Sequence, residues 1–218
     1  MSTIKQIQES IQITNEDNME LMARYEDNYF DLAIVDPPYG IGINHNMGRR
    51  KGDKSSDYDK VNWDNEIPSK EYFDELKRVS KHYIIWGGNY FTEHLEPSNA
   101  WIIWHKMNDG LSFSMCEMAY TNLPINTKLW KMYNKQQNRI HPTQKPIALY
   151  QYLLINYAEK GYKILDTHVG SGSIAISVDS VNKVEKMELT LVGCEIDKKM
   201  YEKSMLRIKE KTSWQSLF

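Results

Sequence analysis

Cysteines, metal-binding motifs and long apolar runs are scarce or missing in this chain of 218 residues. Its two cysteines, Cys116 and Cys194, lie far apart in the sequence, so they predict buried free thiols and not a disulfide framework. The six histidines form neither a His-Glu-x-x-His motif nor a Cys/His cluster, and we expect no structural metal. No apolar run approaches the ~20 residues that span a bilayer. Residues 1–6 lack an apolar signal region, so we expect a cytoplasmic protein with no membrane partner.

Acidic residues are missing from one long stretch. The chain carries a formal net charge of −2, yet no Asp or Glu occurs from Met118 to Ala158. Trp130, Tyr133 and several amides are interleaved there with five basic side chains, which are Lys128, Lys131, Lys135, Arg139 and Lys145. Basic groups can bind phosphates, and amides can read base edges. The stretch therefore predicts a nucleic-acid recognition surface, with a solvated basic face as the alternative.

The order of the apolar segments predicts a single α/β domain over residues 1–218. The chain is long enough for one substantial core and shows no repeat or linker. Strand-like runs alternate with helical ones, which is typical of a mostly parallel sheet flanked by helices. Strands are predicted at 11–13, 32–35, 83–86, 101–104, 117–121, 163–165 and 189–194, and helices at 69–80, 146–158 and 198–211. The last helix places five side chains on one face, which are Met200, Tyr201, Ser204, Met205 and Ile208.

The motif Asp36-Pro37-Pro38-Tyr39 follows the predicted strand at 32–35. The two prolines end this strand because neither has an N–H for the sheet ladder, and each holds the residue before it extended. The strand exit is therefore stiff, and it presents the Asp36 carboxylate, free backbone carbonyls and the Tyr39 ring at one edge. Such a set can grip a planar group that carries an NH2, although a simple strand-ending turn is the alternative.

Residues 40–68 are the longest irregular stretch and include Arg49, Arg50 and Lys51. A loop of this length in a compact domain is usually functional or disordered. Its position directly after Tyr39 predicts a mobile flap over the site, and a solvated loop is the alternative.

A second site is predicted where the strand at 163–165 ends. Asp166 follows this strand, and a glycine-rich turn then leads into a further predicted helix; Gly170 and Gly172 would let the backbone approach a ligand closely. Glu195 ends the next strand about twenty residues later, where an acid can bind ribose hydroxyls. The glycines do not form Gly-x-Gly-x-x-Gly, and no basic residue follows Gly172 as in a P-loop. A nucleoside without phosphates therefore fits better than NAD or ATP.

Taken together, the two motifs resemble those of the S-adenosylmethionine-dependent amino-methyltransferases of DNA. Asp-Pro-Pro-Tyr precedes the glycine motif at 166–173, which is the circularly permuted order of the beta class. Further matches are residues 15–22, Trp63-Asp64, Trp104-His105-Lys106, the strand from Glu117 and the hexapeptide at 141–146. The resemblance covers about residues 11–211 and looks closest to small phage and prophage members. It implies a Rossmann-like methyltransferase fold with S-adenosyl-L-methionine as cofactor.

The resemblance also implies roles for individual residues. Asp36 and the Pro37 carbonyl would accept hydrogen bonds from the target amine, and Tyr39 would stack on a base flipped out of the duplex. Asp17 would contact the adenine of the cofactor and Glu195 its ribose, with helix capping and strand-end solvation as the alternatives. The remaining cofactor residues would be His141, Thr143, Gln144, Lys145, Asp166, His168, Gly170, Ser171, Gly172 and Ser173.

One position departs from the class. The commonest cofactor motif reads Asp-Pro-Phe, whereas this chain has Asp166-Thr167-His168. A histidine ring can stack on adenine or lie along methionine much as Phe does, so the change does not imply loss of function.

DNA contacts are expected from the loop at 40–68 and from a target-recognition segment at about 107–140. The expected side chains are Arg49, Arg50, Lys51, Lys106, Lys128, Lys131, Lys135 and Arg139.

The resemblance implies methylation of adenine N6 in double-stranded DNA, because Asp at the first motif position is more typical of adenine enzymes. The alternatives are cytosine-N4 methylation, methylation of a protein amide, and a non-catalytic protein that binds nucleic acid. The class also allows a homodimer and a cognate restriction endonuclease as partners.

Overall fold

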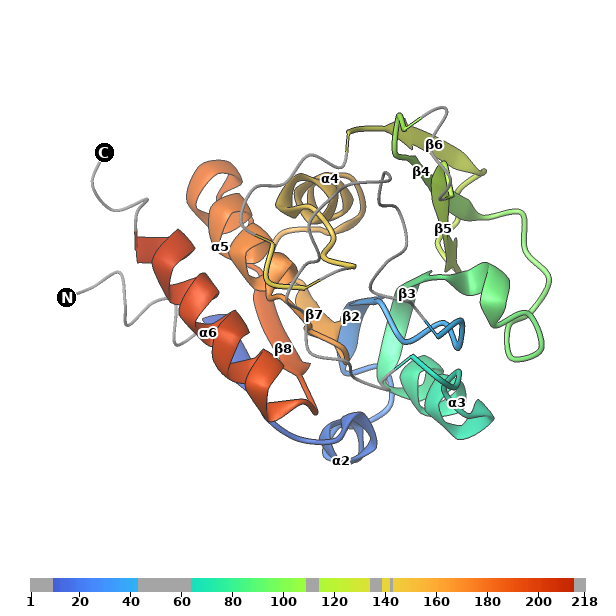
Figure 1. The fold of residues 1–218 in the computed structure, drawn as a ribbon, viewed down its shortest axis with the longest axis horizontal. Coiled ribbons are helices and arrows are strands. Elements are labelled where there is room, and N and C mark those ends of the chain that lie inside the picture. The colour runs from blue at the N-terminus through green and yellow to red at the C-terminus, as the bar shows by residue number, and fades with distance from the viewer. Residues whose placement is uncertain (1–9, 43–63, 109–113, 134–138, 142, 214–218) are drawn as a thin grey trace, which may run out of the picture.

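One mixed sheet is the frame of the computed structural model, which describes residues 10–42, 64–108, 114–133, 139–141 and 143–213 (Figure 1). Within these ranges the sheet has eight strands, in the order β1-β8-β7-β2-β3-β5-β4-β6. Their bounds are β1 Ile11–Thr14, β2 Phe30–Val35, β3 Ser80–Trp86, β4 Trp101–His105, β5 Cys116–Thr121, β6 Lys128–Lys131, β7 Lys163–Asp166 and β8 Thr190–Cys194. Every neighbouring pair is parallel except the two that β5 makes with β3 and β4. The predicted α/β fold with a mostly parallel sheet is therefore confirmed.

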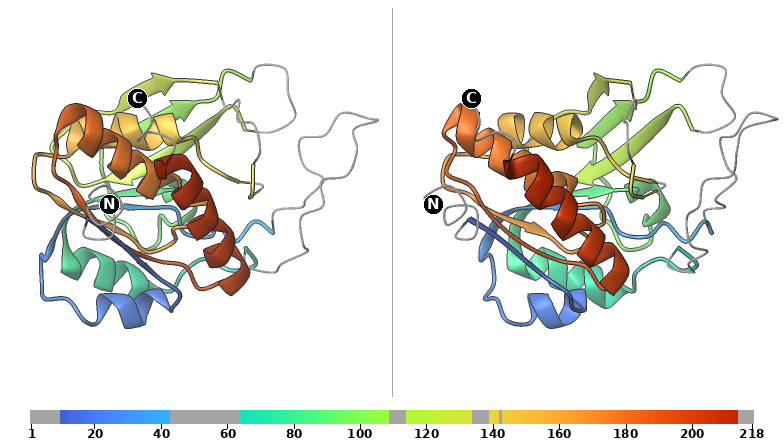
Figure 2. Two further views of the ribbon diagram at one scale, coloured as in Figure 1. Left: turned by 90° about the vertical axis from the view of Figure 1, so that its left-hand side faces the viewer. Right: turned by 60° about the vertical axis from the view of Figure 1, so that its left-hand side comes forward.

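Helices cover both faces of this sheet. The first face is covered by α4 (Ile147–Tyr157), α5 (Ser173–Glu185) and α6 (Lys198–Ser213), and the second by α2 (Asn18–Met22) and α3 (Lys70–Val79). The two groups lie on opposite sides of the strands in Figure 1 and Figure 2. A short 3-10 helix, η1 (Gly88–Tyr90), follows β3.

The alternation of side chains along β2 divides the core into two halves. Leu32 and Ile34 pack with α4, α5 and α6, whereas Ala33 and Val35 pack with α2 and α3. All four are fully buried, because a central parallel strand is covered on both faces. This explains why the strand reads as a continuous apolar run in the sequence.

Four points of the sequence analysis need correction. The sequence analysis did not predict β6 or α2, because β6 carries two lysines in four residues and α2 has only five residues. On α6, Met205 is 37% exposed, and the buried positions include Arg207 beside Ser204 and Ile208. A charged residue thus replaces a predicted apolar one on the packed face. Cys194 is buried as expected. Cys116 is only half-buried, because it is the first residue of β5 and lies at the end of that strand.

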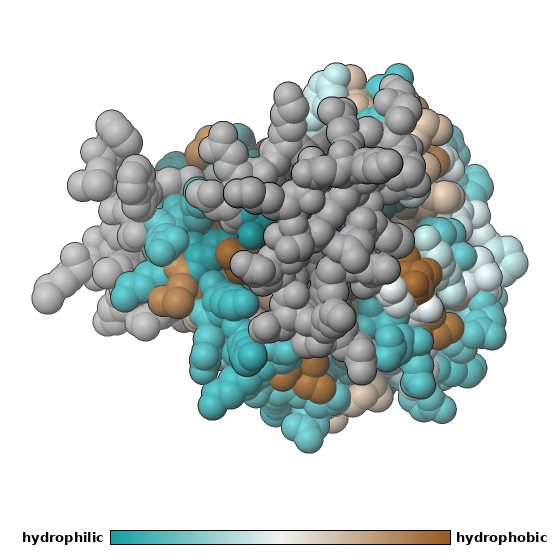
Figure 3. Space-filling model, viewed as in Figure 1, coloured by the Kyte–Doolittle hydropathy of each residue, from teal (hydrophilic) through white to brown (hydrophobic). Residues whose placement is uncertain are grey.

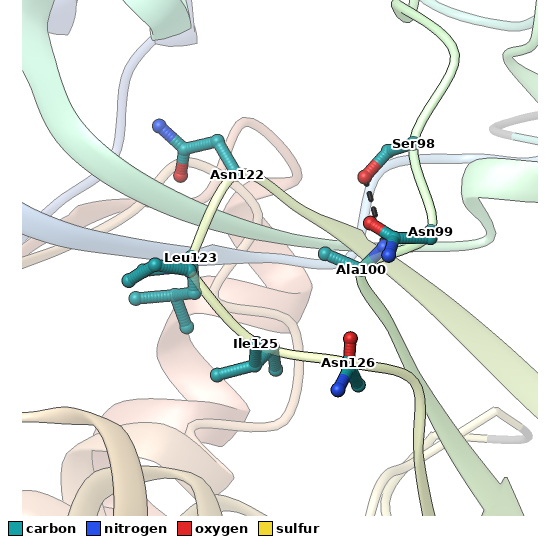
Figure 4. Close-up of a pocket in the computed structure, with 8 residues that line it drawn as sticks. Ser98, Asn99, Ala100, Asn122, Leu123, Ile125 and Asn126 are labelled. Atoms are coloured by element: carbon teal, nitrogen blue, oxygen red, sulfur yellow. Dashed lines mark hydrogen bonds between the residues drawn. The ribbon is translucent and has the colours of Figure 1, made fainter.

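The described surface is largely polar. On the face drawn in Figure 3, hydrophobic residues appear as separate spots among hydrophilic ones. A hollow of about 360 Å³ lies between the loop at 98–100 and the segment at 122–126 (Figure 4). It opens where β4 begins and β5 ends, which is the edge opposite to the Asp36 exit. In the described part of the chain, no helix is both long and apolar enough to cross a membrane.

Candidate active site

The functional side chains gather at one edge of the sheet. Asp36, Gly87 and Lys106 follow the carboxyl ends of β2, β3 and β4, and Asp166 and Glu195 stand at the ends of β7 and β8. Glu117 joins them because β5 runs antiparallel and begins at this edge, with Glu117 opposite Trp104 of β4. In open α/β sheets, ligands bind outside the carboxyl ends of the strands. The motifs from distant parts of the sequence are therefore brought to the expected place.

Asp36 and Tyr39 belong to the motif that the sequence analysis predicted to be catalytic, and they lie in contact. The Tyr39 hydroxyl donates to Asp36 Oδ1 over 2.7 Å. Asp64, which lies about 25 residues later in the sequence, holds the backbone of this turn. Its Oδ1 accepts from the N–H groups of Tyr39 at 2.7 Å and Gly40 at 3.0 Å. Asp64 is 4% exposed, so it acts as a buried anchor for the strand exit.

The ring of Tyr39 lies over a glycine and under a second tyrosine. Gly87 has φ +73°, and a Cβ placed there would come within 2.2 Å of Tyr39 Cε1. Tyr90 of η1 stacks on Tyr39 with ring centroids 5.0 Å apart and planes 15° apart. The Gly87-Gly88 turn thus allows η1 to carry an aromatic ring, 42% exposed, onto the motif.

Lys145 lies between two carboxylates in the interior of the site. Its Nζ is 2.5 Å from Asp36 Oδ1 and 3.1 Å from Glu117 Oε2, and it donates to the Tyr39 hydroxyl over 3.1 Å. Glu117 Oε1 is in turn 2.6 Å from Lys106 Nζ. The Lys145 ammonium also lies 5.3 Å from the centroid of the Trp86 ring, close enough for a cation–π contact. Two acids and two lysines therefore alternate in a chain of ion pairs without net charge.

Burial and these ion pairs set the protonation of the cluster. Burial raises the pKa of Asp36, and Lys145 opposes that rise. Burial would lower the pKa of Lys145, but Asp36 and Glu117 outweigh it and raise the pKa. Burial would likewise raise the pKa of Glu117, yet Lys145 and Lys106 bring it down to about 2. For Tyr39, burial and the nearby Asp36 raise the pKa well above its usual range, so its hydroxyl stays protonated.

The second half of the site surrounds the glycine turn. Gly170 and Gly172 have φ +52° and +75°, which explains the glycines. The Glu195 carboxylate accepts from the N–H groups of Gly170 and Asp197, each over 2.9 Å. Asp166 accepts from the N–H of His168 over 2.9 Å, and burial raises the Asp166 pKa to about 8.

His168 is held on both ring nitrogens. Its Nε2 lies 3.2 Å from the amide nitrogen of Asn18, and its Nδ1 lies 2.9 Å from Thr167 Oγ1. The amide is a donor, so Nε2 accepts and Nδ1 carries the proton. Thr167 is bonded further to the buried Tyr72 hydroxyl at 2.7 Å. Burial lowers the pKa of His168 to about 4, so the ring is a neutral aromatic plate like the Phe it replaces.

The remaining predicted cofactor residues differ in what they contact. Asp17 caps α2 by accepting from the N–H of Met19 over 2.7 Å. Gln144 is 4% exposed, and its Oε1 accepts from the N–H of Ile140. Thr143 Oγ1 lies 2.9 Å from Nδ1 of His141. Pro142, in the same hexapeptide, lies outside the described residues.

Arg207 of α6 supports the glycine turn from below. Its Nη1 donates to the carbonyl of Ser171 over 2.6 Å and to Ser173 Oγ over 3.1 Å. Ser173 Oγ donates in turn to the backbone carbonyl of Lys145 over 2.8 Å. The glycine turn and the segment that carries Lys145 are therefore tied together.

The predicted DNA-contacting residues fall into different environments. Lys106 is paired with Glu117, and its side chain is only 13% exposed. Lys128 and Lys131 are exposed on β6, while Arg139 is half-buried. Since Lys145 is also buried, the stretch poor in acids presents fewer positive charges to solvent than its sequence suggests. Arg49, Arg50, Lys51 and Lys135, with most of the predicted flap, lie outside the described residues.

Several functional neighbours were not foreseen as such. Glu117, Asp64, Asn18 and Arg207 are single polar residues whose partners lie far away in the sequence. A local signal did exist for the contact between the Tyr39 ring and the turn after β3. Two glycines, Gly87 and Gly88, follow Trp86, and glycines at a strand end indicate that another group approaches the backbone closely.

Known proteins support the same interpretation. A family model described as "DNA methylase" matches residues 93–206, which is more than half of the chain. Among curated proteins, the type II methyltransferase M.HpaI of Haemophilus parainfluenzae is 25% identical, over 87% of this chain and 71% of its own length. The type II methyltransferase M2.MboI of Moraxella bovis is 26% identical, over 73% of this chain and 75% of its own length.

Solved structures share the fold. The PvuII cytosine-N4-specific DNA methyltransferase aligns with a TM-score of 0.59 at 11% identity, covering 94% of this chain and 92% of its own. The complex of M1.HpyAVI with SAM aligns with a TM-score of 0.58 at 16% identity, covering 91% and 98%. With the family model matching more than half of its length, this chain belongs to the DNA methylase family of amino-methyltransferases.

Proposed function

We propose that this DNA methyltransferase moves a methyl group from S-adenosyl-L-methionine to the exocyclic N6 of adenine. The observation that carries the proposal is the Asp36 carboxylate, which lies at the carboxyl edge of the sheet beside Tyr39 and in the same site as the glycine turn. The named curated relatives are type II methyltransferases, the PvuII neighbour is a DNA methyltransferase, and M1.HpyAVI was solved with SAM.

The residues around the glycine turn fit this cofactor. Glu195 lies directly against the turn, where a carboxylate can accept from ribose hydroxyls. Asp166 and Asp17 are further acids at the same edge, and His168 offers a neutral ring. The cationic group beneath the turn, Arg207, is already bonded to Ser171 and Ser173. This set of hydrogen-bond acceptors suits hydroxyl and amino groups of a ligand better than phosphates. When bound, the cofactor supplies an electrophilic methyl group on a sulfonium.

The chemical difficulty lies in the target nitrogen, because its lone pair is delocalised into the base. Acceptors that bind its two N–H groups turn the lone pair toward the methyl group. Asp36 and the Pro37 carbonyl are the acceptors in our proposal, and Tyr39 supplies the stacking surface for the extruded base. Tyr90 now covers part of the Tyr39 ring, so we expect Tyr90 to move or to join the stack. Fixed acceptors in a site with little water give most of the rate.

The choice of adenine rests on Asp36. A carboxylate in the first motif position is more typical of the adenine enzymes in the class that this chain resembles. Cytosine-N4 is the second candidate, because a cytosine-N4-specific enzyme is among the structural neighbours.

The product of the reaction tests the proposal directly. After incubation with methyl-labelled S-adenosyl-L-methionine and mixed-sequence DNA, nucleoside analysis should show label in N6-methyldeoxyadenosine. Label in N4-methyldeoxycytidine would replace the adenine assignment. The absence of label in DNA, with the cofactor shown to bind, would refute the proposed activity.

Replacing Asp36 by alanine should lower kcat by about 100-fold or more, because the main acceptor for the target amine is lost. Cofactor affinity should stay within about threefold, since Asp36 accepts from Lys145 and Tyr39 and not from the glycine turn. Asp31→Ala is the matched control. It removes a carboxylate at the other end of β2, which pairs with Lys81, and should leave kcat unchanged. A D36A variant that keeps full activity would contradict the mechanism.

Replacing His168 by phenylalanine should change how stability depends on pH. The folded pKa of about 4 lies below the unfolded value of 6.5, so the unfolded chain binds an extra proton between these values. Stability therefore falls as the pH falls through this range, by up to about 1.4 kcal/mol per pH unit from this group. Urea denaturation from pH 4.5 to 7 should show a shallower dependence in H168F. Parallel curves for the two proteins would show that His168 titrates normally.

Neutralising Lys128 and Lys131 together should weaken DNA binding and lower the slope of log affinity against log salt by about 1.8. Both side chains are exposed on β6. The matched control is K203Q/K209Q, which removes two exposed lysines from α6, an element on a different side of the molecule from β6 (Figure 1). An equal loss in both double variants would place the DNA path elsewhere.

A further inference from the structure

We propose that Glu117 is a positioning residue for Asp36, because it offers Lys145 a second acceptor and so frees the Asp36 carboxylate to bind the target amine. The inference rests on the proposed role of Asp36 as that acceptor. It goes further by assigning a function to Glu117, a β5 residue with no place in the mechanism above.

The contacts of the Asp36 carboxylate show why Lys145 must move away from it before it can bind the target amine. In the described part of the chain, Lys145 Nζ and the Tyr39 hydroxyl both contact the same oxygen, Oδ1, at 2.5 and 2.7 Å. A carboxylate that is held by a buried ammonium has much of its charge neutralised. A target amine approaching Oδ2 would therefore meet a weakened acceptor for as long as Lys145 stays in place.

Glu117 is placed to receive the ammonium. Its Oε2 forms an ion pair with Lys145 Nζ at 3.1 Å, and among the described residues this buried oxygen accepts no hydrogen bond of good geometry. Lys145 Nζ now donates to the Tyr39 hydroxyl and lies closer to Asp36, at 2.5 Å, than to Glu117. A small shift would move the ammonium away from Asp36 Oδ1 and toward Glu117 Oε2, without taking it out of the cluster.

The outer pair keeps Glu117 ready for this exchange. Lys106 binds the other oxygen, Oε1, at 2.6 Å, so Glu117 stays ionised although it is buried. Removing one partner of a buried pair usually leaves an uncompensated charge. In the alternating order Lys106, Glu117, Lys145, Asp36, each charge keeps an opposite charge beside it. This holds whether the Lys145 ammonium lies nearer to Asp36 or nearer to Glu117.

The groups that face Asp36 come from several elements. They are Tyr39 after β2, Tyr72 of α3, Glu117 of β5, Lys145 before α4, Tyr150 of α4 and Asp166 of β7. Lys145 is the cation among them, and Glu117 and Asp166 are the acids. Charge changes at Lys145 and Glu117 should therefore shift the titration of Asp36 in opposite directions.

The test follows the Asp36 carboxyl carbon by carbon-13 NMR in the cofactor-free protein, together with the pH dependence of kcat/KM for DNA methylation. In Glu117→Gln, the Asp36 midpoint and the acidic limb of kcat/KM should move to lower pH by about one unit, because a nearby negative charge is lost. The kcat should fall about tenfold, because the ammonium then stays on Asp36. In Lys145→Met, both should move to higher pH by about one unit or more.

Three further variants separate positioning from folding. Glu117→Asp keeps the charge and should restore the wild-type limb. K106M/E117Q removes the whole outer pair, leaves no lone lysine, and should shift Asp36 as E117Q does. Asp179→Asn breaks another buried carboxylate–lysine pair, with Lys183 at 2.8 Å on α5, and should lower stability without moving the acidic limb of kcat/KM.

Shifts of E117Q and K145M in the same direction, or no shift in E117Q, would overturn the inference. Wild-type protein that fails to methylate DNA would instead refute the proposed function on which it rests.

Discussion

The ammonium of Lys145 is the contact on which the rest of the site depends. It is nearly fully buried, and it neutralises two carboxylates that would otherwise repel each other in a low-dielectric interior. Without it, Asp36 and Glu117 could not both stay ionised at the end of the sheet. Replacing buried ion pairs by apolar residues is often neutral or stabilising, so a row of four charges with little exposure to solvent is poorly explained by stability alone. Their position beside Tyr39, at the edge where such sheets bind ligands, points to catalysis instead.

The same residue connects the two halves of the site. Its side chain belongs to the ion-pair cluster with Asp36 and Glu117, while its backbone carbonyl accepts from Ser173 at the start of α5. Arg207 then joins Ser173 and Ser171 to α6. The glycine turn, the Asp36 carboxylate and the helices α5 and α6 are therefore linked by short hydrogen bonds and ion pairs. A site that must hold a nitrogen and a methyl group in line benefits from this kind of support, because small displacements are costly in rate.

The sequence predicted the features that local patterns encode. The apolar run before Asp36, the two prolines and the glycines at 170 and 172 each have a direct structural cause, and the order of the segments was enough for the α/β fold. The sequence did not predict the partners of Lys145. The resemblance placed Lys145 among the cofactor residues, whereas in the structure its side chain contacts Asp36 and Glu117, because the antiparallel direction of β5 brings Glu117 to this edge. Arg207 was missed for a similar reason, because no local pattern distinguishes a buried arginine from a solvated one.

The most direct measurement for this account is a crystal structure of the chain with duplex DNA and a non-reactive analogue of S-adenosyl-L-methionine. We predict an extruded adenine whose exocyclic nitrogen lies about 3 Å from the free oxygen of Asp36, with its ring against Tyr39 and with Lys145 turned toward Glu117. The analogue should lie along the glycine turn with its ribose at Glu195. A base bound away from Asp36, or a Lys145 ammonium that contacts the carboxylate of the analogue and not Glu117, would contradict the account.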